Sequence, residues 1–139
     1  MALGGMAQVV LPNDASAANA AQSAPKSAAR GVDGLIAHLH QAFAITPAQE
    51  KLFQALADVM RENAATMSSL AKRRVEGSGG MTAVDDLKSY SELSEAHADG
   101  TRKMIPAFQA LYDSMSDAQK KAADEEFREH YSSHHRSRT

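Results

Sequence analysis

The chain has 139 residues, with 15 Lys and Arg against 17 Asp and Glu, six His and no Cys, a length that suits one domain and not two. The lack of cysteine excludes disulfides, thiolate metal sites and cysteine nucleophiles, and no stretch approaches the roughly 18 apolar residues of a transmembrane helix. No basic stripe with interleaved aromatic residues is present, so nucleic acid is not an expected partner.

Residues 1–30 are predicted to be a disordered leader or linker. Residues 12–30 are rich in Ala, Ser, Asn and Pro and have no periodic apolar face, so they cannot bury enough surface to offset chain entropy. Residues 5–8 resemble a small-residue signal-peptidase site, although no basic segment or full apolar segment precedes them. Two interpretations stay open: a signal peptide lies upstream of or is truncated at Met1, or this is an ordinary flexible terminus.

A short helix is predicted after Gly31, where the apolar residues adopt a period of 3.6. Its apolar face comprises Val32, Leu35, Ile36, Leu39 and Phe43. The segment Ile45-Thr46-Pro47-Ala48-Gln49 then marks the start of a second helix. Thr46 suits the N-cap and Pro47 suits the first helical position. Gln49 can bond back to the Thr46 amide and complete a capping box.

The helix that begins there is predicted to be long. Its apolar residues keep the 3/4 spacing as far as Val75: Leu52, Phe53, Leu56, Met60, Met67, Leu70 and Ala71. Some 28 residues would form a rod of about 42 Å. The glycine-rich run at residues 77–80 then ends the helix and supplies a turn.

A second long helix is predicted to start at Thr82, with Asp85 and Asp86 favourably placed in its first turn. Its apolar stripe comprises Val84, Leu87, Tyr90, Leu93, His97, Met104, Phe108 and Leu111. Because Gly100 and Pro106 lie inside the stripe, we expect a weakened or bent segment around residues 100–106.

The last helix is predicted to start at Met115-Ser116-Asp117-Ala118-Gln119, which repeats the pattern of residues 45–49. It should run to about Tyr131 with Ala122, Ala123 and Phe127 inward, before a flexible His- and Arg-rich tail over residues 132–139. The sequence therefore predicts an all-α domain of two long and two short helices, in which the long helices form an elongated hairpin.

The two boxes begin 70 residues apart, and each follows a bulky apolar residue. Through them, residues 32–130 resemble the LTXXQ-motif family, the Spy/CpxP group of periplasmic proteins. The strongest stretches are ITPAQEKLFQALADVMRENAATM and LYDSMSDAQKKAADEEF. The resemblance implies an LTXXQ-type helical domain over residues 31–131, built as a hairpin that dimerises into a thin curved cradle.

The resemblance also implies a function. Family members act as ATP-independent chaperones that bind unfolded proteins, or as periplasmic regulators of envelope stress and metal response. Two departures are present: Ile-Thr and Met-Ser stand where Leu-Thr is usual, and residues 76–130 carry six basic against twelve acidic groups. The second departure matters more, because a basic concave face is associated with the best-known chaperone of the group.

Candidate residues fall into two sets with a structural and a functional interpretation each. The box residues Ile45, Thr46, Gln49, Met115, Ser116 and Gln119 are interpreted as structural helix caps. The methionines Met60, Met67 and Met104, with Phe108, could offer an adaptable surface to unfolded clients, because flexible thioethers repack against many shapes. Their helical spacing favours an ordinary core over a client surface.

A second functional hypothesis is a metal sensor or metal-binding protein that takes zinc, nickel or copper. His130 and His134 are four residues apart, as in helical metal sites, and His135 or His97 could join them. The alternative is a solvated histidine-rich tail, with His97 at the edge of the core or within it. No phosphate loop or nucleophile elbow is found. We therefore expect no catalytic residue and no bound cofactor.

Overall fold

The computed structural model describes the backbone of residues 31–136 and the side chains of residues 31–130. The predicted leader, residues 1–30, lies outside these residues. A first helix covers residues 31–42, followed by a 3₁₀ turn η1 (Pro47–Gln49), α2 (Glu50–Gly77), a 3₁₀ turn η2 (Ser78–Gly80), α3 (Ala83–Asp113) and α4 (Asp117–Arg136). The described chain contains no strand. The predicted all-α fold of four helices is confirmed.

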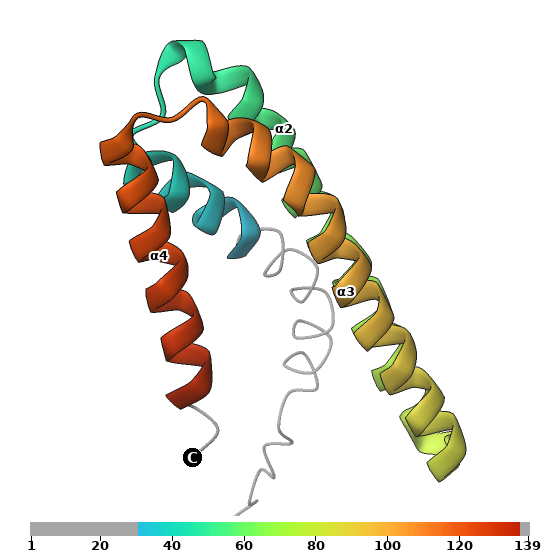
Figure 1. Ribbon diagram of the computed structural model, residues 1–139. Coiled ribbons are helices and arrows are strands. Elements are labelled where there is room, and N and C mark those ends of the chain that lie inside the picture. The colour runs from blue at the N-terminus through green and yellow to red at the C-terminus, as the bar shows by residue number, and fades with distance from the viewer. Residues whose placement is uncertain (1–30, 137–139) are drawn as a thin grey trace, which may run out of the picture.

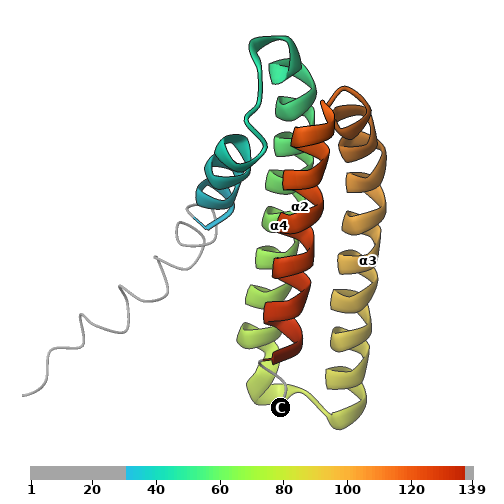
Figure 2. The same ribbon diagram turned by 60° about the vertical axis from the view of Figure 1, so that its left-hand side comes forward.

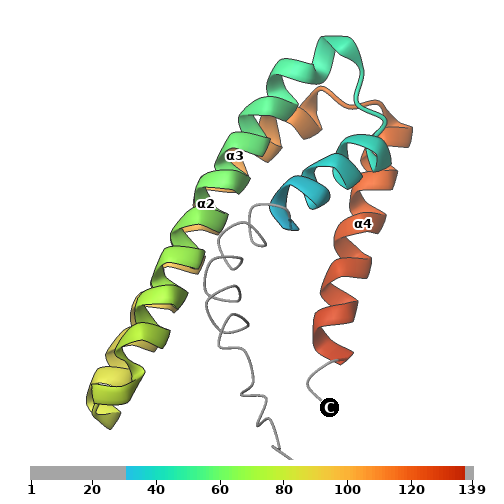
Figure 3. The ribbon, with the colours of Figure 1, turned by 180° about the vertical axis from the view of Figure 1, so that it is seen from behind.

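The long helices α2 and α3 form the predicted hairpin. They run side by side along their whole length, with α3 in front of α2 in Figure 1 and behind it in Figure 3. Leu56 and Met60 of α2 and Leu111 of α3 are buried members of a single core. The two helices thus bury one apolar side of each against the other, which a single amphipathic helix in water could not do.

The first helix and α4 lie on one side of this hairpin, near the end where α2 starts and α3 ends (Figures 1 and 3). Phe43 and Phe53 are fully buried there, with Ile36, Met115 and Ala123 completing the core. The hairpin extends well beyond the first helix, and α4 diverges from it towards the C-terminal end (Figure 1). Among the described residues, this side of the hairpin is therefore covered mainly near the starts of α2 and α4.

Residues 100–106 remain part of α3, which is one uninterrupted helix of 31 residues, and α3 changes direction towards its C-terminal end in Figure 1, in agreement with the bend expected there. Pro106 lies on an exposed part of α3, inside the helix. Gly100 is buried against α2, where Asn63 Nδ2 donates a 2.9 Å hydrogen bond to the Gly100 carbonyl. A Cβ at Gly100 would come within 2.9 Å of Asn63 Cγ. The glycine therefore permits a close approach of the two helices and does not weaken α3.

The last helix is longer than expected. It runs to Arg136 and not to about Tyr131, so residues 132–136 of the predicted tail are helical. The positions of His130 and His134 belong to this one helix.

Candidate functional site

The first capping box joins Thr46 to Gln49. The Thr46 amide donates to Gln49 Oε1 at 3.1 Å, as predicted. The box arrangement is present, but the Thr46 hydroxyl makes no cap hydrogen bond, because the Gln49 amide donates to the Thr46 carbonyl at 2.9 Å. The chain enters α2 through the short 3₁₀ turn that this bond closes. The cap at this end is therefore carried by the Gln49 side chain.

The second box is complete. The Ser116 amide donates to Gln119 Oε1 at 2.9 Å, and the Gln119 amide donates to the Ser116 hydroxyl at 3.2 Å. Both reciprocal bonds of a capping box are thus formed at the start of α4. Ser116 is the better hydroxyl cap of the two.

The two glutamines also meet each other. Gln49 Nε2 donates to Gln119 Oε1 at 3.1 Å, and Gln119 Nε2 donates to Gln49 Oε1 at 2.8 Å. Gln49 is only 6% exposed. A buried primary amide has two donors and two acceptor sites to satisfy, and the box itself uses only one of them. The amide pair uses two of the remaining three sites and joins helix starts that are 70 residues apart.

Each of the two glutamines also donates to a backbone carbonyl next to the other box, so the contacts of Gln49 and Gln119 are related by an approximate two-fold axis. Gln49 Nε2 donates to the Ser114 carbonyl at 3.0 Å, and Gln119 Nε2 donates to the Ala44 carbonyl at 3.1 Å. Each carbonyl lies two residues before the other box. Gln119 Nε2 also lies 3.0 Å from the Phe43 carbonyl. We call this set of contacts the motif junction; it leaves no buried side-chain polar atom unpaired among the described residues.

An aromatic cluster adjoins the motif junction on the covered side of the hairpin. Phe108 of α3 packs against Phe127 of α4 at 5.0 Å between ring centroids and against Phe43 at 6.2 Å. Tyr112 completes the cluster at 5.9 Å from Phe108. Phe108 therefore marks the side of α3 that the two short helices cover.

The same side of α3 continues beyond the short helices. Residues seven and four apart lie close to one face of a helix, so Tyr90, His97 and Met104 follow Phe108 along one line, which we call the inner stripe. Phe108 and Met104 are half-buried, whereas His97 is exposed and Tyr90 is 60% exposed. On α2, Val75 shares the helical phase of buried Ala57 and is 73% exposed. Among the described residues, the inner side of the hairpin is thus exposed at Tyr90, His97 and Val75.

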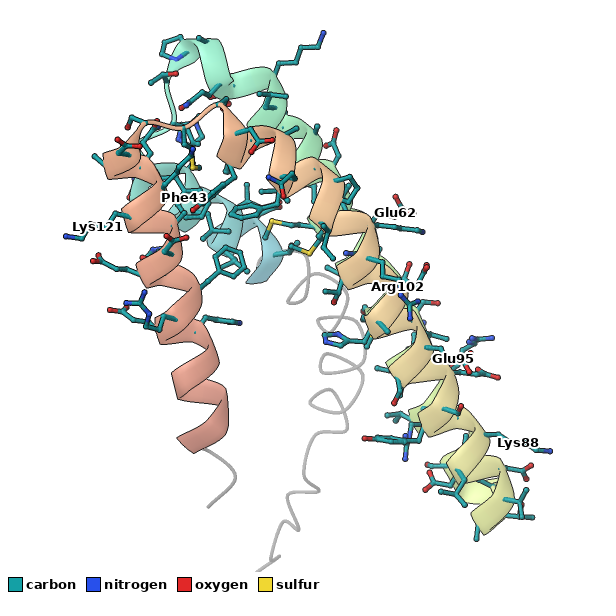
Figure 4. All side chains as sticks on the ribbon, viewed as in Figure 1. Phe43, Glu62, Lys88, Glu95, Arg102 and Lys121 are labelled. Atoms are coloured by element: carbon teal, nitrogen blue, oxygen red, sulfur yellow. The ribbon has the colours of Figure 1, made fainter. Side chains whose placement is uncertain are left out.

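The opposite side of the hairpin is charged. Figure 4 shows Lys88, Glu95 and Arg102 of α3 and Glu62 of α2 pointing away from the first helix and α4. Opposite charges alternate along this side, as expected for a solvated helix face. The hairpin therefore has two unlike faces.

A family model for the LTXXQ motif family matches residues 31–127. The chain belongs to the LTXXQ motif family. It matches no curated protein and no solved structure. Spy/CpxP-like periplasmic proteins are in this family, and its members are non-enzymatic chaperone or envelope-stress proteins. Within residues 31–136, no helix carries an apolar stretch that could span a bilayer.

The family's two boxes lie together in this LTXXQ chain, but the candidate client residues are divided. Met60 is 6% exposed in the core, which corrects its interpretation as client surface, because α3 and its neighbours cover it. Met67, Met104 and Phe108 are half-buried. Of the box residues, Met115 is buried, Ile45 is half-buried, and the two hydroxyl caps are exposed.

The histidines take different positions from those expected. His97 is exposed and not enclosed by the core. His38 Nε2 lies 3.1 Å from Glu126 Oε2 on α4, and His40 Nε2 lies 2.8 Å from Glu50 Oε2 on α2. These contacts attach the first helix to both neighbours.

The metal hypothesis stays a prediction. His130 is exposed, and the side chains of His134 and His135 lie outside the described residues. Among the side chains that the structure describes, no group of three His, Cys, Asp or Glu residues could hold a metal ion.

Hydrogen bonds shift three pKa values. The bond from His40, with a further one from Gln54, lowers the pKa of Glu50 below its usual value. Bonds from the Thr82 amide and hydroxyl lower the pKa of Asp85, which caps the start of α3. The bond to Asp124 raises the pKa of Tyr112, because that bond favours the protonated phenol.

Sequence reasoning missed the pairing of the two glutamines and the two histidine contacts. A signal for the first was present: the same residue type ends both boxes, and a capping box leaves the amide NH₂ group without a partner. No local signal identifies the partners of His38 and His40, because these are set by how the first helix packs.

Proposed function

We propose that this LTXXQ protein is an ATP-independent periplasmic chaperone, which as a homodimer holds unfolded or partly folded proteins on the inner side of its hairpin. The observation that carries the proposal is the inner stripe. It leaves the aromatic cluster at Phe108 and continues uncovered to Tyr90, which is 60% exposed. Contiguous exposed apolar surface on a small domain is typical of an interaction site.

The architecture supports a holding role over an enclosing one. The hairpin is two helices thick; Figure 2 shows α2 and α3 side by side with α4 in front of them, and Figure 1 shows that α4 diverges from the hairpin. The residues lining the inner side differ in size and include the flexible side chain of Met104, which suits clients of varied shape. The family is associated with periplasmic proteins, which supports the location.

The test is aggregation of a chemically denatured model protein, followed by light scattering with increasing amounts of the full chain. We expect suppression at near-equimolar ratios. The variant Val75→Ser with Tyr90→Ser should lose much of it, because both side chains are largely exposed and contribute to the apolar side. The matched control, Glu62→Ser with Arg102→Ser, alters the charged side and should retain suppression. Absence of suppression at every ratio would reject the proposal.

A further inference from the structure

The first helix lies on the inner side of the hairpin with its start directed towards the turn between α2 and α3. Near the end of this helix, His40 Nε2 lies 2.8 Å from Glu50 Oε2, at the start of α2. Near its beginning, Asp33 Oδ1 accepts a 3.1 Å hydrogen bond from Arg61 Nε, further along α2. The chain that precedes the first helix therefore joins the hairpin on its inner side, at the level of Arg61.

Beyond this level the inner side has no net charge. On α2, four residues follow the buried Ala57 at spacings that keep to one face: Ala64, Ser68, Ala71 and Val75. On α3 the inner stripe continues through His97 to Tyr90. The Arg74 guanidinium lies 5.9 Å from the centroid of the Tyr90 ring and is paired with Asp86 at 2.7 Å, so its charge is balanced. We call this surface, from Ala64 to Val75 and from His97 to Tyr90, the far inner side.

An apolar run precedes the first helix in the sequence. Residues 1–11 contain no charged side chain, and Val9-Val10-Leu11 is the only run of branched aliphatic residues before residue 31. Cleavage at the small-residue site of residues 5–8 would leave this run in place. An uncharged apolar run and an uncharged, largely exposed apolar surface suit each other, because burial of both removes apolar area from water.

The length of the intervening chain matches the distance to this surface. Val75 lies 14 residues beyond Arg61 on α2, which is about 21 Å along the helix axis. The composition of residues 12–30 is that of a linker, and a flexible linker of about 19 residues has a root-mean-square span of about 24 Å. A linker is most effective when this span matches the distance to be covered, and the effective concentration then reaches about 1 mM.

We propose that residues 9–11 dock in cis on the far inner side, between Ala71 and Tyr90, as an internal substitute for a client segment. This inference rests on the proposed function, in which the same side of the hairpin holds clients, and it adds a regulator to it. The docked run covers exposed apolar surface when no client is present. A client that offers a longer apolar segment displaces the run, because three residues make only a small contact.

The expected effect on client binding is small enough to be reversible and large enough to measure. At an effective concentration of about 1 mM, a contact with a dissociation constant of about 0.5 mM is formed in about two-thirds of the molecules. Only the remaining third is open to a client, so the apparent dissociation constant of the client rises about threefold. Removal of the apolar run should therefore tighten client binding by about threefold.

Cysteine cross-linking tests the docking without reference to chaperone activity, since the chain has no native cysteine. Gln8→Cys with Ala71→Cys should form a disulfide within one chain under mild oxidation, seen as loss of free thiols at monomer mass. The matched control is Gln8→Cys with Glu95→Cys, because Glu95 points to the opposite side of the hairpin (Figure 4). Both target positions lie about 12–15 Å beyond the level of Arg61. The first pair should link at least about ten times faster than the control.

A further variant separates docking from mere proximity. Adding Val9→Ser with Leu11→Ser to the Gln8→Cys and Ala71→Cys pair keeps the linker and removes the apolar run. Its linking rate should fall at least about fivefold. An unchanged rate, or equal rates for the two target positions, would overturn the proposal. Disulfide-linked dimers as the main product would show that the run binds a second copy, and would overturn the contact in cis.

Client binding gives the second readout, measured by fluorescence anisotropy of a labelled, chemically denatured protein with the full chain. Val9→Ser, Val10→Ser and Leu11→Ser together should lower the dissociation constant about threefold, whereas the linker control Asn13→Ser with Asn19→Ser should leave it unchanged. Unchanged or weaker binding in the triple variant would reject the regulatory role. If the chain binds no client at all, the proposed function fails, and the cross-linking rates alone decide whether the run docks.

Discussion

The motif junction can be tested by one isosteric change, Gln49→Glu. The carboxylate keeps the size of the amide and the oxygen that accepts from Thr46 and from Gln119. It loses both donated hydrogen bonds, to the Ser114 carbonyl and to Gln119 Oε1. An anionic oxygen then faces two acceptors in a site that is 6% exposed.

The cost can be worked from these contacts. Each of the two lost hydrogen bonds costs about 0.5–1.5 kcal/mol, and the buried charge left without a donor costs about 1–3 kcal/mol or more, so the change destabilises the fold by roughly 2–6 kcal/mol. That is a large part of the 5–15 kcal/mol that typically separates native and unfolded states. At about 4–8 °C per kcal/mol for a domain of roughly this size, the melting temperature should fall by at least about 8 °C.

The assay is thermal and urea unfolding followed by circular dichroism, with Gln41→Glu on the exposed side of the first helix as the control. The control should change stability by no more than about 0.5 kcal/mol. Burial of the new carboxyl at position 49 should raise its pKa. A raised pKa stabilises the fold at low pH, so Gln49→Glu should partly recover as pH falls from about 7 to 5. A variant that melts with the wild type at both pH values would refute the role assigned to the amide pair.

Three further predictions concern the helix caps, the contact between Gly100 and Asn63, and the dependence of stability on pH in acid. Ser116→Ala should lower the free energy of unfolding by about 1 kcal/mol. Thr46→Ala should lower it less, because of the two hydroxyls only that of Ser116 accepts a cap bond. Unfolding curves measure both effects, and the folded fraction of each variant should retain aggregation suppression. A stable but inactive Thr46→Ala would instead place that box on the client surface. Gly100→Ala should destabilise the hairpin by about 1–3 kcal/mol, since its Cβ would meet Asn63 at 2.9 Å, and adding Asn63→Ala should restore part of the loss; additive effects would contradict the close contact. Because the His40 bond lowers the pKa of Glu50, this carboxylate stabilises the fold above its usual pKa near 4.5 and loses that effect as pH falls through the lowered value. Glu50→Gln should therefore show a flatter stability profile in acid, and an unchanged slope in urea melts across that range would exclude the contribution.

Capping patterns are local, and this explains which parts of the fold the sequence could predict. The starts of α2 and α4 follow from Thr46, Gln49, Ser116 and Gln119, because each box involves residues only three apart. The contact between the two glutamines involves residues 70 apart. A pattern that describes one helix start contains no information on which other start it meets.

Periodicity likewise predicts a face but not its partner. The stripe expected on α3 combined Leu93 and Leu111, which pack inward, with Leu87 and Tyr90, which remain largely exposed. All four fit a helical apolar pattern. Whether a residue is buried depends on which other helix covers its face, and periodicity alone does not identify that helix. Gly100 shows the same limit, since propensity marks it as weak and only the contact with Asn63 shows its use.

The motif junction lies at one end of the hairpin, and no helix of residues 31–136 covers the opposite end at Ser78–Gly80. The hairpin is therefore anchored by packing at the end that holds the motif junction, while the end at Ser78–Gly80 projects away from it. Equal insertions of whole heptads in both arms would lengthen it by about 10 Å per heptad without moving any contact at the anchored end. Reach could thus vary in evolution while the anchoring pair of glutamines stays unchanged, and a designer could adjust the length of the binding surface in the same way.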